Sequence, residues 1–298
     1  MKNIFYDDNK KVRNGWWIIL FIGLIALTRP IYKPVKQVLS QIGFTEHMLE
    51  PVSLILLFFV TYICLRIRRQ SLSDVGIRIN LYWFKQFFIG TFAGIGMILI
   101  TVLLIYAIDG VTFELNQERD INIVIYGLYL FLLGAFFEEL LHRGFIFQRL
   151  IEGIGPIGAQ LLIASLFAFG HAGNPGMEGT TEIFATLNLF LLSLIFGFAY
   201  IKTHSLALPI GLHLGWNWAQ GNILGFGVSG HNTAGWLKPT FHGVDEWITG
   251  GNFGPEASIF SIAVCILSLI GLYHWKSKIK LANNIEPPKE ESTSIVQK

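Results

Sequence analysis

The chain has 298 residues, of which 52% are hydrophobic and only 14% charged, and its mean hydropathy is +0.53. Soluble domains contain about 45–50% apolar and about 25% charged residues, so this composition indicates a membrane protein and excludes an ordinary soluble domain. The net charge is only +2, and the sequence has no basic stripe of the kind that binds nucleic acids, so we predict no nucleic-acid partner.

Eight stretches of the sequence are apolar and approach the length of roughly 20 residues with which a helix crosses the hydrocarbon core. They are residues 16–32, 52–66, 87–108, 121–143, 157–171, 183–201, 206–220 and 257–275. Arg29 and Pro30 interrupt the first stretch, but no small-residue cleavage site follows, so we interpret it as an anchor and not as a cleaved signal peptide. The fold class predicted is all-α, a polytopic membrane helical bundle of about eight transmembrane helices.

Basic residues gather in the loops on one side of these spans. Because short cytoplasmic loops of membrane proteins are enriched in lysine and arginine, we predict that this side, with both termini, is cytoplasmic. Arg29, Lys33 and Lys36 in the first external loop are a local exception. The residues on the cytoplasmic side are Lys2, Lys10, Lys11, Arg13, Arg66, Arg68, Arg69, Arg143, Arg149, Lys202, Lys276, Lys278 and Lys280.

The chain divides into four parts. Residues 1–120 hold about three N-terminal transmembrane helices, and residues 121–220 hold the spans that carry polar groups. Residues 221–255 form an external loop rich in glycine, asparagine and histidine. Residues 256–298 comprise the last transmembrane helix and a cytoplasmic tail, in which the composition of 283–298 is typical of disorder.

The fourth span contains FFEELLHRGF, residues 136–145, where charged groups enter an otherwise apolar run. A charged side chain in a bilayer costs about 2.5–3.5 kcal/mol on the insertion scale, so such residues usually face a bundle interior or a water-filled cavity. Glu139 and Arg143 are four residues apart on a helix, which favours an ion pair. Glu138 points about 100° away from Glu139 and is left to face something else.

Two other spans carry polar residues at helical spacing. The fifth ends in FAFGHAGNPG with His171, and the seventh contains GLHLGWNW, in which His213 and Asn217 share one face. Counted from the turn near residue 154, Glu138 and His171 lie at heights within roughly 2 Å of each other, and His213 lies lower by roughly 9 Å. That gap closes if the fourth helix protrudes into the cytoplasm. We therefore predict one polar cavity, reached from the cytoplasmic side.

Such a cavity has the residue types for hydrolysis. Glu138 and His171 would polarise a water molecule, while His213 and the Asn217 amide would donate hydrogen bonds to the oxyanion. Glu138, His171 and His213 also have the ligand types of a zinc site with water in the open position. The cofactor therefore stays open between a divalent metal such as zinc and a metal-free Glu/His mechanism. His142 is interpreted as a structural or interfacial residue.

Three motifs, in this order along the chain, resemble a known family. EELLHRG (138–144), FAFGH (167–171) and HLGWN (213–217) are similar to the EExxxR, FxxxH and HxxxN/D motifs of the CPBP family. That family includes the type II CAAX prenyl endopeptidases and the Abi-like bacteriocin-processing and immunity proteases. The resemblance covers about residues 121–220, which it marks as the catalytic core, and it implies an intramembrane endopeptidase that opens to the cytoplasm.

The resemblance also implies roles for individual residues. Glu138 would activate the water, His171 would assist or ligate, and the oxyanion would be stabilised by His213 and Asn217. Glu139 and Arg143 would hold the site together. Because the family counts as metalloproteases while a metal-free mechanism is also argued for it, the resemblance leaves the metal open.

The partners that we expect are a peptide or protein substrate in or at the membrane and the lipid bilayer, and the expected location is the plasma (inner) membrane of a bacterium, as a multi-pass protein. Two alternatives to a protease stay open. One is a non-enzymatic immunity or scaffold protein, in which the polar cluster only joins helices. The other is a proton-coupled transporter, which predicts an internal repeat and broken helices in matching halves; neither is evident in the sequence.

Overall fold

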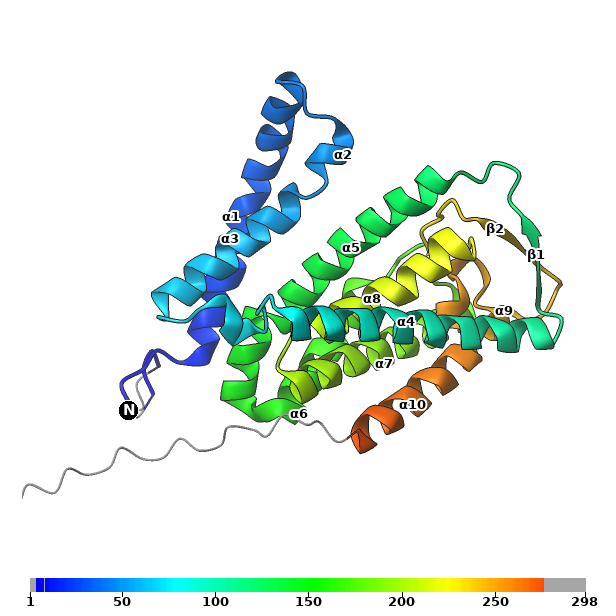
Figure 1. The fold of residues 1–298 in the computed structure, drawn as a ribbon. Coiled ribbons are helices and arrows are strands. Elements are labelled where there is room, and N and C mark those ends of the chain that lie inside the picture. Colours follow the sequence, from blue (N-terminus) through cyan, green and yellow to red (C-terminus); the bar gives the residue numbers. More distant parts are fainter. Residues whose placement is uncertain (1–3, 8, 276–298) are drawn as a thin grey trace, which may run out of the picture.

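A computed structural model describes residues 4–7 and 9–275 of the chain, except for the side chains of residues 46 and 47. The predicted disordered tail, 283–298, lies outside the described residues. The main helices are α1 (Asn14–Gln41), α3 (Val52–Ile67), α4 (Leu81–Ala107), α5 (Ile121–Arg143), α6 (Phe145–Gly170), α7 (Gly179–Thr203), α8 (Ala207–Trp218) and α10 (Ile259–His274) (Figure 1). The shorter elements are α2 (Glu46–Leu49), η1 (Leu72–Val75), β1 (Val111–Leu115), η2 (Ala219–Ile223), β2 (Leu237–Phe241), α9 (Glu246–Thr249), η3 (Gly251–Phe253) and η4 (Pro255–Ala257).

The described part of the chain is mostly helical, and four of its helical segments are long and apolar enough to cross a membrane. They are α1, α4, the continuous stretch of α5 and α6, and α7, while α3 and α10 are shorter apolar helices. The predicted span 206–220 corresponds to α8, which has 12 residues and is continued directly by the π-helix η2. At 1.5 Å per residue α8 without η2 is about 18 Å long. The count of eight spans and the cytoplasmic termini stay predictions.

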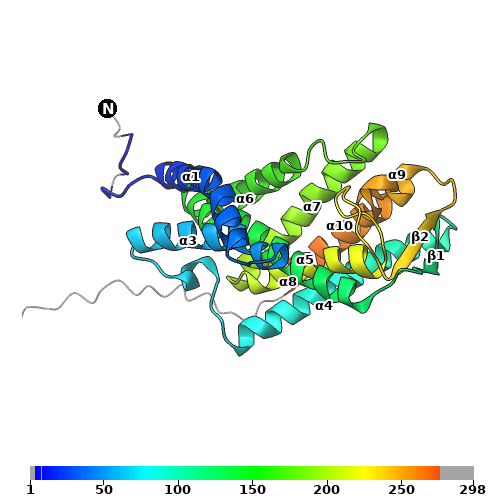
Figure 2. The same ribbon diagram turned by 90° about the horizontal axis from the view of Figure 1, so that it is seen from above.

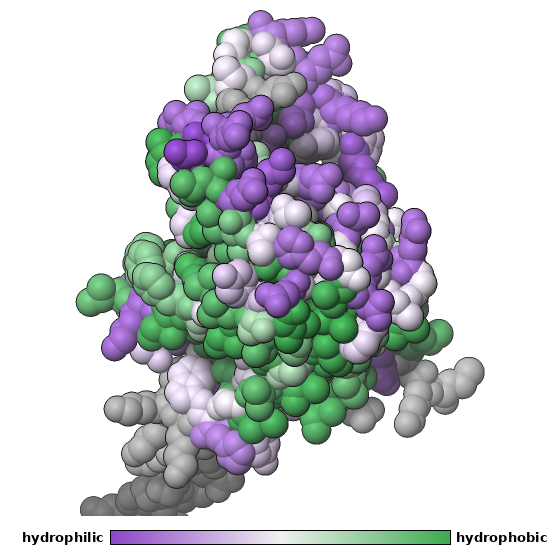
Figure 3. All heavy atoms as spheres, turned by 90° about the vertical axis from the view of Figure 1, so that its right-hand side faces the viewer, coloured by the Kyte–Doolittle hydropathy of each residue, from purple (hydrophilic) through white to green (hydrophobic). Residues whose placement is uncertain are grey.

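Large hydrophobic side chains on the outer faces of the helices are consistent with a lipid environment. Phe92 of α4 is 70% exposed and Phe169 of α6 is 78% exposed. Such residues would be costly in water but are well solvated by lipid tails. Figure 3 views the end of the molecule that carries the strands, where a broad hydrophobic area lies beside a hydrophilic one.

The helices α1 and α3 form a hairpin that stands apart from the other helices at its α2 end (Figures 1 and 2). Its other end packs against α5 and α6. There the ring of Phe21, which is fully buried, stacks on Phe145 at a centroid distance of 5.3 Å. The helix α1 continues through Pro30 and Pro34, so the predicted first span extends to Gln41.

Close packing of α4 against α8 fixes the helix that carries His213. A Cβ atom on Gly90 or Gly94 of α4 would collide with the backbone of α8, and one on Gly211 or Gly215 of α8 would collide with α4. Glycines spaced four apart on both helices therefore let the two backbones touch, as in other membrane helix pairs.

A kink in α6 sets the position of His171. Gly155 has φ 77°, a conformation that favours glycine, and Pro156 follows it. The first part of α6, residues 145–154, therefore turns away from the second part, residues 156–170, which returns along α7 and ends next to His171.

The two strands lie at one end of the bundle, beyond the C-terminus of α4 and the N-terminus of α5 (Figure 1). They pair antiparallel, with Val111 opposite Phe241 and Leu115 opposite Leu237. The segment 221–255, predicted as an external loop, thus contains β2, α9 and η3 and folds back onto the bundle.

Candidate active site

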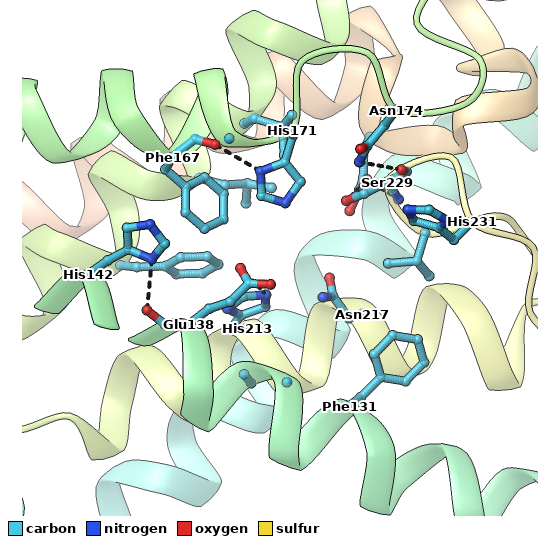
Figure 4. Close-up of a pocket in the computed structure, with 18 of the residues that line it drawn as sticks. Phe131, Glu138, His142, Phe167, His171, Asn174, His213, Asn217, Ser229 and His231 are labelled. Carbon is cyan, nitrogen blue, oxygen red and sulfur yellow. Dashed lines mark hydrogen bonds and ion pairs between the residues drawn. The ribbon is translucent and has the colours of Figure 1, made fainter. Parts of the chain in front are cut away.

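All four side chains predicted to be catalytic line one pocket of about 610 Å³. Glu138 comes from α5, His171 follows the end of α6, and His213 and Asn217 come from α8. Figure 4 shows them around the same space. The structure therefore brings together residues that are spread over about 80 positions of the sequence.

Beneath the pocket lies a fully buried ion pair. Arg143 Nη1 is 3.2 Å from Glu139 Oε1, and both side chains have no exposed surface. Arg143 Nη2 also donates to the carbonyl oxygen of Ser193 at 2.9 Å and to its hydroxyl. The guanidinium lies between the rings of Phe167 and Phe196, 5.2 and 5.5 Å from their centroids. The ion pair predicted from the spacing is thus present, and it ties α5 to α6 and α7.

His213 lies between the two adjacent glutamates. Its Nδ1 is 3.0 Å from Glu139 Oε1, and its Nε2 is 4.0 Å from Glu138 Oε2. Because the Glu139 carboxylate is paired with Arg143 and only accepts hydrogen bonds, Nδ1 carries a proton and Nε2 faces Glu138. The imidazole also stacks on the Phe196 ring, with centroids 5.0 Å apart. The bond from His213 to Glu139 was not predicted from the sequence.

A hydrogen bond to a carbonyl oxygen orients each of two further histidines. His171 Nδ1 is 2.8 Å from the Phe167 carbonyl oxygen, and His142 Nδ1 is 2.8 Å from the Glu138 carbonyl oxygen (Figure 4). Since a carbonyl only accepts, Nδ1 of each ring is the donor and Nε2 is left unprotonated in the neutral form. His142, which we interpreted as structural or interfacial, lines the pocket with the others.

Glu138 is available for chemistry in a way that Glu139 is not. Its side chain is 32% exposed, whereas that of Glu139 is fully buried. Glu139 Oε1 is bonded to Arg143 and His213, whereas no hydrogen bond from a described residue to the Glu138 carboxylate is formed. Gly134 and Ala135, one turn earlier on α5, also line the pocket, and their small size leaves space beside the carboxylate.

The ligand geometry of a metal ion is not formed by these side chains. Within residues 4–7 and 9–275, no group of three His, Cys, Asp or Glu side chains is arranged to hold a metal ion. Glu138 Oε2 and His213 Nε2 are 4.0 Å apart, whereas ligands about 2.0–2.2 Å from one zinc ion in tetrahedral geometry lie closer together. Glu138, His171 and His213 share the pocket, but they do not fit the predicted zinc site in this arrangement.

Part of the pocket comes from a region that sequence reasoning did not include. Ser229, His231 and Thr233 precede β2, and Glu256 lies in η4; all four line the pocket. Burial raises the pKa of the Glu256 carboxyl, while hydrogen bonds from Ser229 and the electrostatic effect of the nearby His171 oppose this rise. No motif in 221–256 marks these residues, and their contribution depends on how this part of the chain folds back.

The helical bundle encloses a carboxylate, several imidazoles and an amide. These are the side-chain types of an intramembrane hydrolase site. Residues 120–219 match the family model described as type II CAAX prenyl endopeptidase Rce1-like. The match covers about a third of the chain, includes Glu138, His171, His213 and Asn217, and confirms for this segment the family that the three motifs predict. No curated protein matches the chain. The match and the apolar helices support a protease-type hydrolase that is integral to the membrane.

Proposed function

We propose that this protein is an intramembrane endopeptidase that hydrolyses a peptide bond of a membrane-associated peptide or protein with a water molecule activated by Glu138 and His171. The observation that carries the proposal is the contrast within one pair of residues: Glu139 is fully buried and ion-paired with Arg143, while Glu138 is 32% exposed and lines the pocket. A carboxylate held in a partly desolvated pocket, beside an imidazole, is suited to general-base catalysis.

In the first step, the Glu138 carboxylate takes a proton from water while the water oxygen forms a bond to the carbonyl carbon of the substrate. His171 Nε2, which its bond to Phe167 leaves free, accepts a second hydrogen bond from the same water and orients it. The products of this step are a protonated Glu138 and a tetrahedral oxyanion.

Asn217 and His213 are suited to stabilise that oxyanion. The Asn217 amide lines the pocket and has no hydrogen-bond partner among the described residues, so its N–H groups are free to donate. His213 Nε2 becomes a donor when it too carries a proton, and the Nδ1 bond to Glu139 fixes the direction of the ring. Donors aimed at a developing oxyanion in a water-poor site contribute strongly to catalysis.

In the second step, the carbon–nitrogen bond breaks and the proton held by Glu138 passes to the leaving amine. This returns Glu138 to the carboxylate form and releases an acid and an amine as products. Glu138 thus carries one proton from the water to the leaving amine, the second proton of His213 stays on its ring through both steps, and no step passes through a metal ion.

The unpaired carboxylate also distinguishes this proposal from a polar cluster that only joins helices. In such a cluster the polar side chains bond to one another, as Glu139 and Arg143 do. Glu138 instead faces open space in the pocket. Hydrolysis accounts for this arrangement, whereas helix packing does not require it.

We further propose that the protein is located in the bacterial plasma (inner) membrane and that its substrate is a peptide, a leader segment or a membrane protein. The motif resemblance extends to Abi-like bacteriocin-processing and immunity proteases, whose bacterial members generally have no prenylated substrate. A prenylated peptide remains a useful comparison substrate for that reason.

The test uses the full-length protein in liposomes with quenched fluorescent peptides, each with an apolar segment followed by a polar one, with and without a prenylated cysteine. The wild-type protein is expected to cleave at least one of them, and Glu138→Gln is expected to cleave none at a measurable rate. Glu118→Gln, an exposed position in the loop before α5, is the matched control and should cleave normally. Equal cleavage by the Glu138→Gln and wild-type proteins would exclude the mechanism.

A further inference from the structure

The pocket has two walls of different origin. One wall comes from α5, α6, α7 and α8, within the residues matched by the family model, and includes Phe131, Phe167, Leu189, Leu192 and Phe196. The other wall consists of Val228, Ser229, His231 and Thr233 and is connected to Glu256, all beyond residue 219. In Figure 4, Glu138 and His213 lie between Phe167 and His142 on one side and Ser229 and His231 on the other.

The second wall is built on a tight turn, which we call the 228–231 turn. Val228 and His231 exchange two backbone hydrogen bonds of 2.9 Å. Both central residues have positive φ, 48° at Ser229 and 84° at Gly230. Two consecutive residues of this kind are typical of a type I′ turn, for which Asn-Gly is the favoured sequence. A serine at the first position is strained and must be held by its surroundings.

Glu256 supplies that restraint from below the turn. The carboxylate is 1% exposed, and it accepts hydrogen bonds from the Ser229 backbone N–H at 2.8 Å and from the Ser229 hydroxyl at 3.1 Å. Its other oxygen accepts from Trp216 Nε1 at 3.2 Å. Trp216 lies between His213 and Asn217 on α8, so Glu256 connects the turn directly to the helix that carries two proposed catalytic residues.

Two further contacts hold the turn from the sides. Asn174, three residues after His171, donates from Nδ2 to the Ser229 carbonyl oxygen at 2.9 Å. Gly230 donates its N–H to the Phe253 carbonyl oxygen at 3.0 Å, and a Cβ atom at this position would collide with the Pro175 carbonyl. These contacts hold the turn against the segment that follows α6.

The side of the pocket formed by the 228–231 turn is polar, whereas the side with Phe167 combines an aromatic ring with His142 and His171 (Figure 4). The His231 ring is exposed and has no hydrogen-bond partner among the described residues, so it is available to a substrate. A substrate carboxylate on this side would lie near the carboxyl groups of Glu138 and Glu256, which disfavours an acidic residue. A neutral side chain that forms hydrogen bonds, such as that of asparagine, fits the polar side.

We propose that the 228–231 turn, positioned by Glu256, is the specificity wall of the active site. The turn selects a neutral hydrogen-bonding residue on one side of the scissile bond. The aromatic rings across the pocket accept an apolar residue on the other side of that bond. This inference rests on the proposed function and adds the substrate class. The inference predicts cleavage at the junction between an apolar and a polar segment of the substrate. Glu256 is a positioning residue in this scheme, because it acts through Ser229 and Trp216.

The test compares pairs of peptides that differ only in asparagine or leucine, which are similar in shape, at each position next to the cleavage site. Wild-type protein in liposomes is expected to prefer asparagine at one of these positions by about tenfold in kcat/KM, as expected for one hydrogen bond. His231→Ala should lower that preference to about one, and the change should appear in KM more than in kcat. His242→Ala, at an exposed histidine directly after β2 that does not line the pocket, should keep the preference.

Glu256 variants separate positioning from folding. Glu256→Ala should abolish the preference, whereas Glu256→Gln keeps one carbonyl acceptor for Ser229 N–H and should restore part of it. Ser229→Gly removes the strain of the positive φ but also removes the hydroxyl. Its preference for asparagine is expected to lie between those of the two Glu256 variants. His231→Ala leaves the core untouched, so it decides the question even if Glu256→Ala does not fold.

The inference fails if wild-type protein shows no such preference, or if His231→Ala keeps it. The parallel Glu138→Gln assay distinguishes this failure from that of the proposed function. If Glu138→Gln is inactive and the preference does not move in His231→Ala, the specificity wall alone is wrong. If Glu138→Gln cleaves as wild type does, or wild type cleaves no peptide, the proposed function fails and this inference with it.

Discussion

Glu138 and Glu139 are neighbours in the chain, yet His213 joins them from opposite sides of its ring, with Nδ1 on Glu139 and Nε2 facing Glu138. The buried carboxylate fixes the imidazole, and the accessible one shares the pocket with it. A paired acid that orients a histidine towards a second, reactive group is a common arrangement in enzyme active sites. The predictions below follow from this division between a supporting and a reacting glutamate.

Replacing Glu138 by glutamine removes the proposed base but keeps the size of the side chain. We expect kcat to fall by about 10²–10⁴-fold, the usual contribution of general-base catalysis. Thermal unfolding in detergent should change little, because the side chain reaches the pocket and its Oε2 has no partner to lose among the described residues. A large loss of stability in this variant would show that Glu138 is structural.

Replacing Arg143 by alanine leaves Glu139 fully buried without its ion-pair partner. Removing one partner of a buried pair costs about 3–5 kcal/mol, so the variant should unfold at a markedly lower temperature or denaturant concentration. Arg66→Ala, at an exposed position near the end of α3, is the control and should unfold as the wild-type protein does. Full stability of Arg143→Ala would contradict the supporting role of this ion pair.

Replacing Asn217 by alanine tests the proposed oxyanion donor. We expect kcat to fall by about 10²–10³-fold with a small change in KM, since the donor acts on the transition state and not on the bound substrate. Folding should be retained, because no described residue is bonded to this amide. A variant with normal kcat and raised KM would instead assign Asn217 to substrate binding.

A pair of glycines on α4 tests the contact with α8. Gly94→Ala places a methyl group against the Leu212 carbonyl and should cost about 1–3 kcal/mol of stability. Gly96→Ala, two residues further along the same helix, meets nothing within 4 Å and should be neutral or stabilise by up to about 1 kcal/mol. Equal effects of the two substitutions would show that the helices are not in this close contact.

Removal of divalent ions tests the metal-free mechanism. Because Glu138, His171 and His213 do not converge to metal-ligand distances, we expect peptide cleavage to persist after EDTA treatment and dialysis. The measurement is the cleavage rate before and after treatment, together with the metal content of the purified protein. A loss of activity that added zinc restores would show that these side chains rearrange around a metal ion.

Local patterns in the chain were sufficient to predict that this is a membrane protein, where most of its helices lie, and that Glu139 pairs with Arg143. Apolar runs reflect the thickness of the lipid core, and residues four apart on a helix meet whatever the rest of the fold does. The three motifs also indicated the family, which the match to residues 120–219 confirms for that segment. The roles of Glu138, His171, His213 and Asn217 within it stay predictions.

Other features depend on contacts between segments that are far apart in the chain. The bond of His213 to Glu139 needs α5 and α8 side by side, and the position of His171 needs the kink at Gly155. The wall of Ser229 and His231 exists because a buried carboxylate, Glu256, holds a strained turn over the pocket. No periodicity encodes such contacts, since they arise when side chains from several elements compete for one desolvated space.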